Sequence, residues 1–183
     1  MKQFFLSVLS IVSISVNAQV FSTSTGNIDF VSITKFEEFS AKNNQVSAAV
    51  SADKGAIQFK VPVNSFQFEK ALMQSHFQEN YMESATYPNS TFKGKIKDLS
   101  SVKFNADGVY DVVAEGTLEM HGVSKEVSVP GKITVKGGAV NLQANFSILC
   151  SDYGIKIPKN NVNQISNSIA LKVNCDLAPK KKK

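Results

Sequence analysis

The chain has 183 residues, enough for one domain that buries its own core without disulfide bonds. Its formal net charge of +5 comes from the ends, because Lys2 and the Lys180–Lys183 run are basic while the remaining lysines balance the 15 acidic residues. The chain contains no arginine, and no segment alternates basic with aromatic residues, which makes nucleic acid a poor candidate partner.

Residues 1–18 have the pattern of a cleaved signal peptide. A positive start is followed by the apolar run Phe4–Val16 and by the small-residue cleavage pattern Val16-Asn17-Ala18. The run is too short, and too often interrupted by serine, for a bilayer span of about 20 residues. We therefore expect a mature chain from Gln19 and a periplasmic or secreted bacterial protein. A buried first strand or helix is the alternative.

From residue 19 onward, apolar and polar residues alternate at period two, in runs separated by turn signals. This pattern predicts antiparallel hairpins and about eight strands. The expected strands begin near Ile28 and Phe30 and continue through residues 46–50, 57–63, 92–96, 110–120, 127–135, 140–150 and 165–175.

A sheet of this size that is apolar on one face must form a sandwich or close on itself, because open edges aggregate. We expect an all-β, antiparallel barrel, whose interior is just wide enough for side chains or one small ligand. Small inward residues such as Val112, Ala114 and Gly116 leave space inside. The sequence leaves open whether a ligand or bulky side chains such as Phe59 and Phe92 fill it.

One helical segment, at about residues 66–83, interrupts the strand pattern. Its apolar residues share one broad face: Leu72, Met73, Phe77, Tyr81 and Met82. The spacings Asn64-x-x-Gln67 and Ser75-x-x-Gln78 each match a capping box, so two short helices are an alternative to one. The segment is expected to form a lid or flank of the barrel.

The two cysteines and two histidines predict neither a disulfide nor a metal site. If residues 139–150 and 165–175 form one hairpin, Cys150 and Cys175 lie about 25 Å apart at strand spacing, far beyond the roughly 7 Å limit of a disulfide. Two free, inward-pointing thiols are therefore expected, although their redox state stays open. His76 and His121 lack the partner spacings of a zinc site.

Three segments carry a resemblance to a known family: His76-Phe77 with Tyr87-Pro88 and Phe92, Gly116-x-Leu118 with His121–Lys125, and Asp152–Ile155. They resemble the YceI-like proteins, bacterial periplasmic lipid-binding proteins that have no known catalytic apparatus. The resemblance implies a lipocalin-like barrel over residues 19–179 whose pore holds a polyisoprenoid or similar long apolar lipid. An arginine and an aspartate often precede the family's His-Leu pair, but residues 71–75 supply neither.

What the resemblance and the strand parity imply is a lipid tail buried in the pore. The expected ligand-binding residues are Phe59, Val61, Leu72, Met73, Phe77, Phe92, Val112, Leu118, Val129, Ile133, Leu142, Phe146 and Leu171. No catalytic residue, metal or cofactor is expected besides the bound lipid. Head-group contacts and the accepted chain length stay open.

The expected function is sequestration or transport of an apolar lipid, with transient contact at a membrane surface and a homodimer left open. The lysine tail 180–183 would favour an anionic membrane at about 1 kcal/mol per lysine, or it is simply solvated. One alternative is a lipid- or ester-modifying enzyme that uses the same pocket, but no Gly-x-Ser-x-Gly nucleophile motif is present. Another is a stress-related structural protein with a dry core.

Overall fold

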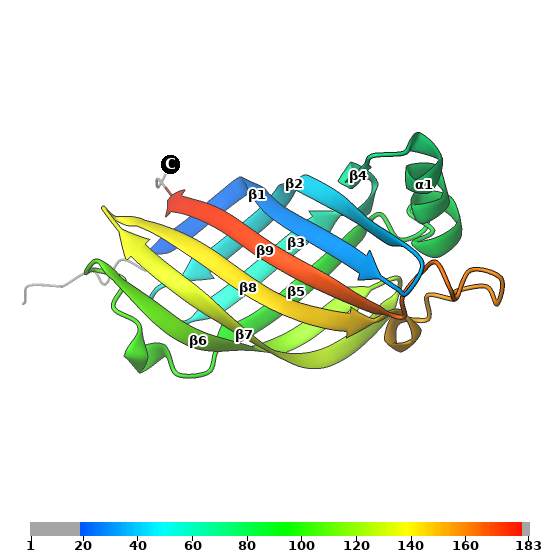
Figure 1. Ribbon diagram of the computed structural model, residues 1–183. Coiled ribbons are helices and arrows are strands. Elements are labelled where there is room, and N and C mark those ends of the chain that lie inside the picture. The colour runs from blue at the N-terminus through cyan, green and yellow to red at the C-terminus, as the bar shows by residue number, and fades with distance from the viewer. Residues whose placement is uncertain (1–18, 181–183) are drawn as a thin grey trace, which may run out of the picture.

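The computed structural model describes residues 19–180, which form a closed antiparallel barrel with a helical segment at one end (Figure 1). The expected signal peptide and Lys181–Lys183 lie outside the described residues. The strands are β1 (Val20–Ile33), β2 (Glu38–Ser51), β3 (Ala56–Pro62), β4 (Gln67–Phe68), β5 (Asn89–Ile96), β6 (Gly108–Met120), β7 (Val123–Lys136), β8 (Ala139–Leu149) and β9 (Ser168–Pro179). Between residues 19 and 180, no helix has the length and apolar character needed to cross a membrane.

The strand order confirms the predicted barrel. Eight long strands follow one another as β1-β9-β8-β7-β6-β5-β3-β2, and pairing of β1 with β2 closes the ring. The short strand β4 adds only two residue pairs to the outer part of β2. Consecutive hairpins make most of these pairs, as the turn signals predicted. The β7–β8 pairing is partial: only Gly131–Lys136 and Ala139–Ala144 are in register, so Val123–Pro130 of β7 pairs with β6 alone.

The first and last strands are longer than, or displaced from, their predicted ranges. β1 starts at Val20, because Val20–Thr23 pair with β2, and Phe21 and Ser22 pair also with β9. β9 starts at Ser168 rather than at residue 165, because Ile165 belongs to the preceding connection, where its N–H donates to the Asn161 carbonyl. Apolar periodicity therefore marks the buried part of a strand rather than its hydrogen-bonded limits.

The two ends of the barrel differ in their packing. At the end that holds the start of β1 and the end of β9, Phe21 stacks on Phe104 with ring centroids 5.9 Å apart. Phe21 is paired in register with Val50, and Val140 is paired with Leu177. All of these side chains are buried. We call this the closed end, because its core is packed by the protein's own residues.

Both cysteines are free and buried, as the hairpin geometry predicted. Cys175 lies opposite Leu142 in the β8–β9 register, and Cys150 follows the end of β8, so the pair is separated along the hairpin. Cys175 fits beside Gly26 at an irregularity of β1, where a Cβ atom would overlap its sulfur. The absent side chain of Gly26 is thus what makes room for this thiol.

The helical segment lies at the opposite end of the barrel (Figure 1). It consists of the α-helix α1 (Ala71–His76), which continues without a break into the π-helical turn η2 (Phe77–Tyr81). The alternative of two capped helices is therefore wrong. Asn64 lies in a separate 3-10 turn, η1 (Val63–Ser65), and Ser75 lies inside α1. Phe66–Phe68, predicted as helical, is extended, and α1 begins after Lys70 without a side-chain cap.

The remaining helical turns are short. η3 (Leu99–Ser101) lies between β5 and β6, and η4 (Cys150–Tyr153) follows β8. Gly154, which ends η4, has φ +68°, a backbone conformation that favours glycine. From Gly154 the chain runs through a long connection, residues 154–167, before it enters β9. This connection lies at the same end of the barrel as α1 (Figure 1).

Candidate functional site: an apolar cavity in the barrel

The barrel encloses two adjoining apolar chambers. The outer chamber, next to the helical segment, has a volume of about 280 Å³. The inner chamber, deeper between the sheet walls, has a volume of about 120 Å³. The two share the lining residues Ile28, Val61, Ser90, Leu118, Phe146 and Val173. They are therefore successive parts of one bore along the barrel axis.

Small residues on the walls create the inner chamber. Ala114 on β6 faces inward, as does Ala144 on β8, which is paired with Gly131 of β7. A Cβ atom at Gly131 would lie 2.6 Å from the Gln143 carbonyl oxygen, so the close approach of β7 to β8 needs a glycine there. Because these inward side chains are small, the opposite wall does not reach them. The interior is thus not filled by the protein's own side chains.

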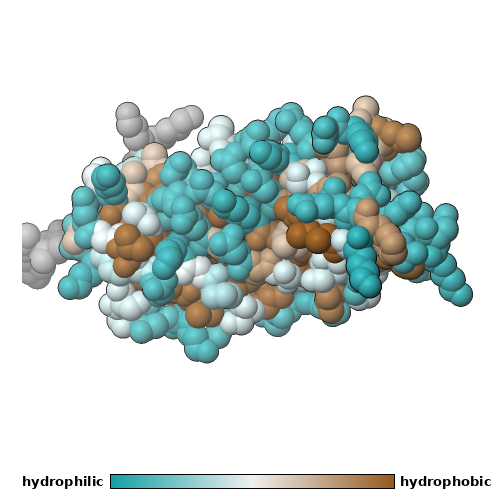
Figure 2. All heavy atoms as spheres, viewed as in Figure 1, coloured by the Kyte–Doolittle hydropathy of each residue, from teal (hydrophilic) through white to brown (hydrophobic). Residues whose placement is uncertain are grey.

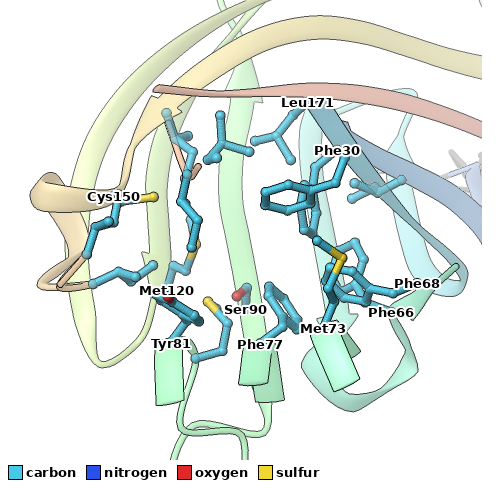
Figure 3. Close-up of a pocket in the computed structure, with 18 of the residues that line it drawn as sticks. Phe30, Phe66, Phe68, Met73, Phe77, Tyr81, Ser90, Met120, Cys150 and Leu171 are labelled. Carbon is cyan, nitrogen blue, oxygen red and sulfur yellow. The ribbon is translucent and has the colours of Figure 1, made fainter. Parts of the chain in front are cut away.

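A cluster of phenylalanines forms one side of the outer chamber (Figure 3). Phe30 on β1 is at its centre, with ring centroids 5.4 Å from Phe66 and 5.5 Å from Phe77. Phe68 lies 5.1 Å from Phe77. Met73 projects from α1 into the same side of the chamber (Figure 3). Aromatic rings packed beside the flexible Met73 side chain form an apolar wall that can adjust its shape.

Polar groups in the outer chamber are few. Ser90 lies on the wall between the two chambers, and the other polar lining residues are near the helical end: Glu37, His76, Asn161 and Gln164. None of these is a lysine, and the chain has no arginine. The inner chamber has Thr91, Lys132 and Gln143 among its lining residues, but most of its lining is apolar. The bore as a whole therefore suits a hydrocarbon chain.

Three segments surround the outer end of the chamber, which we call the mouth: the β1–β2 turn (residues 34–37), the helical segment (residues 71–81) and the connection 154–167. Asn161 Nδ2 donates to the Tyr81 hydroxyl at 2.9 Å, which joins the connection to the helical segment. The Thr34 hydroxyl donates to the Asn163 carbonyl at 2.8 Å, which joins the turn to the connection. The mouth is therefore held by individual polar contacts rather than by a continuous sheet.

His121 lies outside both chambers and contacts two segments near the helical end. Its Nδ1 donates to the Tyr153 carbonyl at 3.0 Å, and its ring lies edge-on to Tyr87 with centroids 4.8 Å apart. The side chain is only 11% exposed, so His121 is packed against its neighbours rather than exposed to solvent. His121 therefore joins the β6–β7 turn to η4.

The structure places twelve of the thirteen predicted ligand residues on the chambers. The outer chamber contains Met73, Phe77 and Leu171; the inner contains Phe59, Phe92, Val112, Val129, Ile133 and Leu142; and both contain Val61, Leu118 and Phe146. Leu72 is the predicted residue that the structure does not place on the chambers. It is 67% exposed and outside both chambers, because it lies about 100° around the helix from Met73.

Several lining residues were not predicted. Ile148, Ile169 and Val173 are two residues from predicted positions on their strands, so strand parity alone would have found them. Phe66 and Phe68 were hidden by the helical interpretation of their segment. No local signal identifies Asn161 or Gln164, which reach the mouth only through the course of the long connection.

The thiol in the outer chamber is unsuited to nucleophilic chemistry. Burial raises the pKa of Cys150, so the neutral thiol is favoured over the reactive thiolate. Between residues 19 and 180, no group of three or more His, Cys, Asp or Glu side chains lies close enough together to hold a metal ion. The lining of the two chambers is mainly apolar.

Comparison with protein families gives one match. The model of the YceI-like domain matches residues 10–177, which is nearly the whole chain. A search of curated proteins found no match.

Solved structures with the same fold come from several bacteria. A polyisoprenoid-binding domain from Saccharophagus degradans, implicated in plant cell wall breakdown, superposes with a TM-score of 0.74 at 18% identity over 90% of this chain and 100% of that one. BcnA from Burkholderia cenocepacia gives 0.69 at 17% identity over 84% and 96%. The Campylobacter jejuni YceI protein gives 0.55 at 18% identity over the whole of both chains. At these identities the likeness establishes the fold.

Proposed function

Because this chain belongs to the YceI-like domain family, we propose that it binds a polyisoprenoid or a similar long apolar lipid in its bore and sequesters or transports it. The observation that carries the proposal is the continuous apolar bore of two chambers, about 280 and 120 Å³, lined by twelve residues predicted to touch a lipid tail. The Saccharophagus neighbour, described as polyisoprenoid-binding, supports the same ligand class.

The volume of the bore sets the length of chain that fits inside. A protein cavity of about 150 Å³ holds a benzene molecule. On that scale the two chambers hold a chain of roughly fifteen carbons, or about three isoprene units. Each buried methylene contributes about 0.8 kcal/mol, from which the ordering of the chain is subtracted. A longer lipid would extend through the mouth or displace side chains of the phenylalanine cluster.

The proposed setting is the bacterial periplasm or the secreted medium. It rests on the signal-peptide pattern of residues 1–18, with residues 19–179 as the single lipid-binding domain. An apolar lipid is insoluble in that aqueous compartment, so a barrel that shields it from water is a physically reasonable carrier. Loading and unloading then require contact with a membrane or with another lipid-handling protein.

The lining residues favour binding over the alternative of a lipid-modifying enzyme. His76 is the histidine that lines the outer chamber, whereas His121 lies outside the lining. The pKa of Cys150 is raised by burial, which opposes its use as a nucleophile. A dry-core structural protein is disfavoured by the volume of the chambers.

Native mass spectrometry of the purified protein, followed by organic extraction, tests the proposal. We expect one lipid molecule per chain, released by organic solvent. The stripped protein should then rebind a C15 isoprenoid alcohol, with a rise in Tm that grows with the alcohol concentration. A protein that is reproducibly empty and that gains no thermal stability from C15 or longer isoprenoid alcohols would overturn the proposal.

A further inference from the structure

Large hydrophobic side chains are exposed around the mouth. Phe36 in the β1–β2 turn is 74% exposed, Leu72 on α1 is 67% exposed, and Val162 in the connection is 53% exposed. Ile33 and Leu149, at the ends of β1 and β8, add to the same end of the barrel. Figure 2 shows a small hydrophobic area over α1, at the upper right, together with others over the sheet. The sixth exposed large hydrophobic residue of the described chain, Val109, is near the closed end.

The exposed position of Phe36 is built into its turn. The Thr34 hydroxyl accepts the N–H of Phe36 at 3.2 Å and that of Glu37 at 3.0 Å. The same hydroxyl is bonded to the Asn163 carbonyl, next to Val162. Phe36 therefore projects from a turn that is fixed both internally and to the neighbouring connection. A phenylalanine held outward in this way is available to an apolar partner.

Each protruding residue is next in sequence to the wall of the outer chamber. Leu72 precedes the lining residue Met73, Phe36 precedes Glu37, and Val162 follows Asn161. The exposed apolar residues thus border the mouth, where Glu37 and Asn161 add polar groups to the lining. A lipid that enters or leaves the bore at this end passes beside these exposed side chains, which lowers the free-energy cost of hydrating its chain.

The charges around the mouth are of both signs. Four exposed lysines, Lys35, Lys70, Lys156 and Lys159, are accompanied by Glu37, Glu38, Glu69 and Glu79. Two further acids face basic groups, because Asp152 is paired with Lys125 at 2.8 Å and Glu83 faces His121. This balance gives no strong preference for an anionic or a cationic partner. It suits a surface that inserts apolar side chains among head groups of both charges.

We propose that the protein docks by its mouth on a lipid bilayer, with Phe36, Leu72 and Val162 inserted into the interfacial layer. This inference rests on the proposed lipid-binding function and names the partner that exchanges lipid with the bore. The lysines beside the inserted residues extend their charged ends toward the phosphate groups. Insertion, rather than attraction to anionic lipid, supplies most of the binding.

The absence of tryptophan from the chain allows a direct test. Phe36→Trp places a single reporter at the mouth, and Val109→Trp places a matched reporter at an exposed apolar position near the closed end. With phosphatidylcholine vesicles, the emission of the Phe36→Trp protein should shift to the blue, equally at low and high salt, and that of the Val109→Trp protein should stay unchanged. Equal shifts, no shift, or a shift that needs anionic lipid and vanishes with salt would overturn the proposal.

A second measurement separates docking from lipid binding. The triple variant Phe36→Ser/Leu72→Ser/Val162→Ser should lower the vesicle partition coefficient at least about tenfold, with Val109→Ser unchanged. Native mass spectrometry of the same variants should show that lipid is still bound. If the protein partitions to vesicles but holds no lipid, the proposed function fails and docking stands. If it holds lipid but does not partition, or if the triple change abolishes a dimer instead, docking is overturned.

Discussion

His121 Nε2 lies 3.6 Å from Glu83 Oε1, and these two are the non-glycine residues of positive φ in the described chain. His121 has φ +51° and Glu83 has φ +44°. Because Nδ1 of His121 donates to the Tyr153 carbonyl, Nε2 of the neutral ring is an acceptor and has no hydrogen-bond partner in the barrel. Two strained backbone positions thus meet where the helical segment ends against the β6–β7 turn.

An alanine variant is usually more stable than the glycine variant at the same position. The strain at His121 should reverse this order of stability. Both His121→Ala and His121→Gly lose the bond to Tyr153, but only alanine keeps a Cβ atom in the left-handed region. We expect His121→Gly to be more stable than His121→Ala by about 1 kcal/mol in denaturant unfolding. At Ser124, an exposed strand position, alanine should be the more stable of the two. The same order at both positions would mean that φ of His121 carries no strain.

Filling the inner chamber should shorten the lipid that the protein accepts. Ala144 lines this chamber of about 120 Å³, so Ala144→Phe would occupy much of the space. We expect the variant to retain a C10 isoprenoid alcohol and to lose at least about tenfold in affinity for the C20 alcohol, which must give up several buried methylenes. Competition binding measures both alcohols, and the exposed change Ser147→Phe on the same strand is the control. Equal affinity losses for the two chain lengths would contradict the assignment of the inner chamber to the tail.

The hydrogen bond between Tyr81 and Asn161 should slow the release of the lipid. Tyr81→Phe keeps the ring that lines the outer chamber and removes only the hydroxyl that accepts from Asn161. The loss of one such bond is worth about 1 kcal/mol, so the dissociation rate of a fluorescent lipid should rise about fivefold. Tyr110→Phe, which removes a longer 3.4 Å contact near the closed end, serves as the control. An unchanged rate in Tyr81→Phe would show that the lipid leaves without separating these two segments.

The stability of the barrel should fall in alkaline solution, in part because of Cys175. Burial raises the pKa of this thiol from 9.0 to about 11. The unfolded chain therefore loses the thiol proton first, and the contribution of the neutral thiol is present below about pH 9 and is lost as the pH rises through about 11. The loss approaches roughly 2 kcal/mol. Urea unfolding under reducing conditions should show a shallower decline between pH 8 and pH 11 for Cys175→Ala. If the stabilities of the wild type and Cys175→Ala fell in parallel with pH, the result would contradict the raised pKa of Cys175.

The residues that line the walls of the barrel can be predicted from strand periodicity, whereas those at the mouth cannot. Val112, Leu118 and Leu142 were predicted to face inward because alternate residues of a strand share a face, and no tertiary information was needed. Asn161 and Gln164 lie in a connection whose path is set by contacts with segments far away in sequence, such as the bond from Asn161 to Tyr81. No local pattern encodes such a contact.

Leu72 and Phe68 show a second limit. Leu72 was assigned to the apolar face of a helix, but it lies about 100° around α1 from Met73, so it is exposed when Met73 lines the chamber. Phe68 was assigned to the same helix although it pairs with Ala41 as part of a strand. In both cases the sequence correctly indicated an apolar side chain. It did not indicate the backbone geometry that sets the direction of that side chain.

The stacking of Phe21 on Phe104 at the closed end gives the bore a direction. Because the packed core blocks passage there, a lipid bound as we propose would enter and leave by the mouth, and its hydrocarbon tail would enter first. Whatever polar group terminates the molecule then remains outermost, beside Glu37 and Gln164. If the barrel binds a lipid as we propose, it would act as a pocket closed at one end rather than as a channel, and the polar terminus of the lipid would face the solvent.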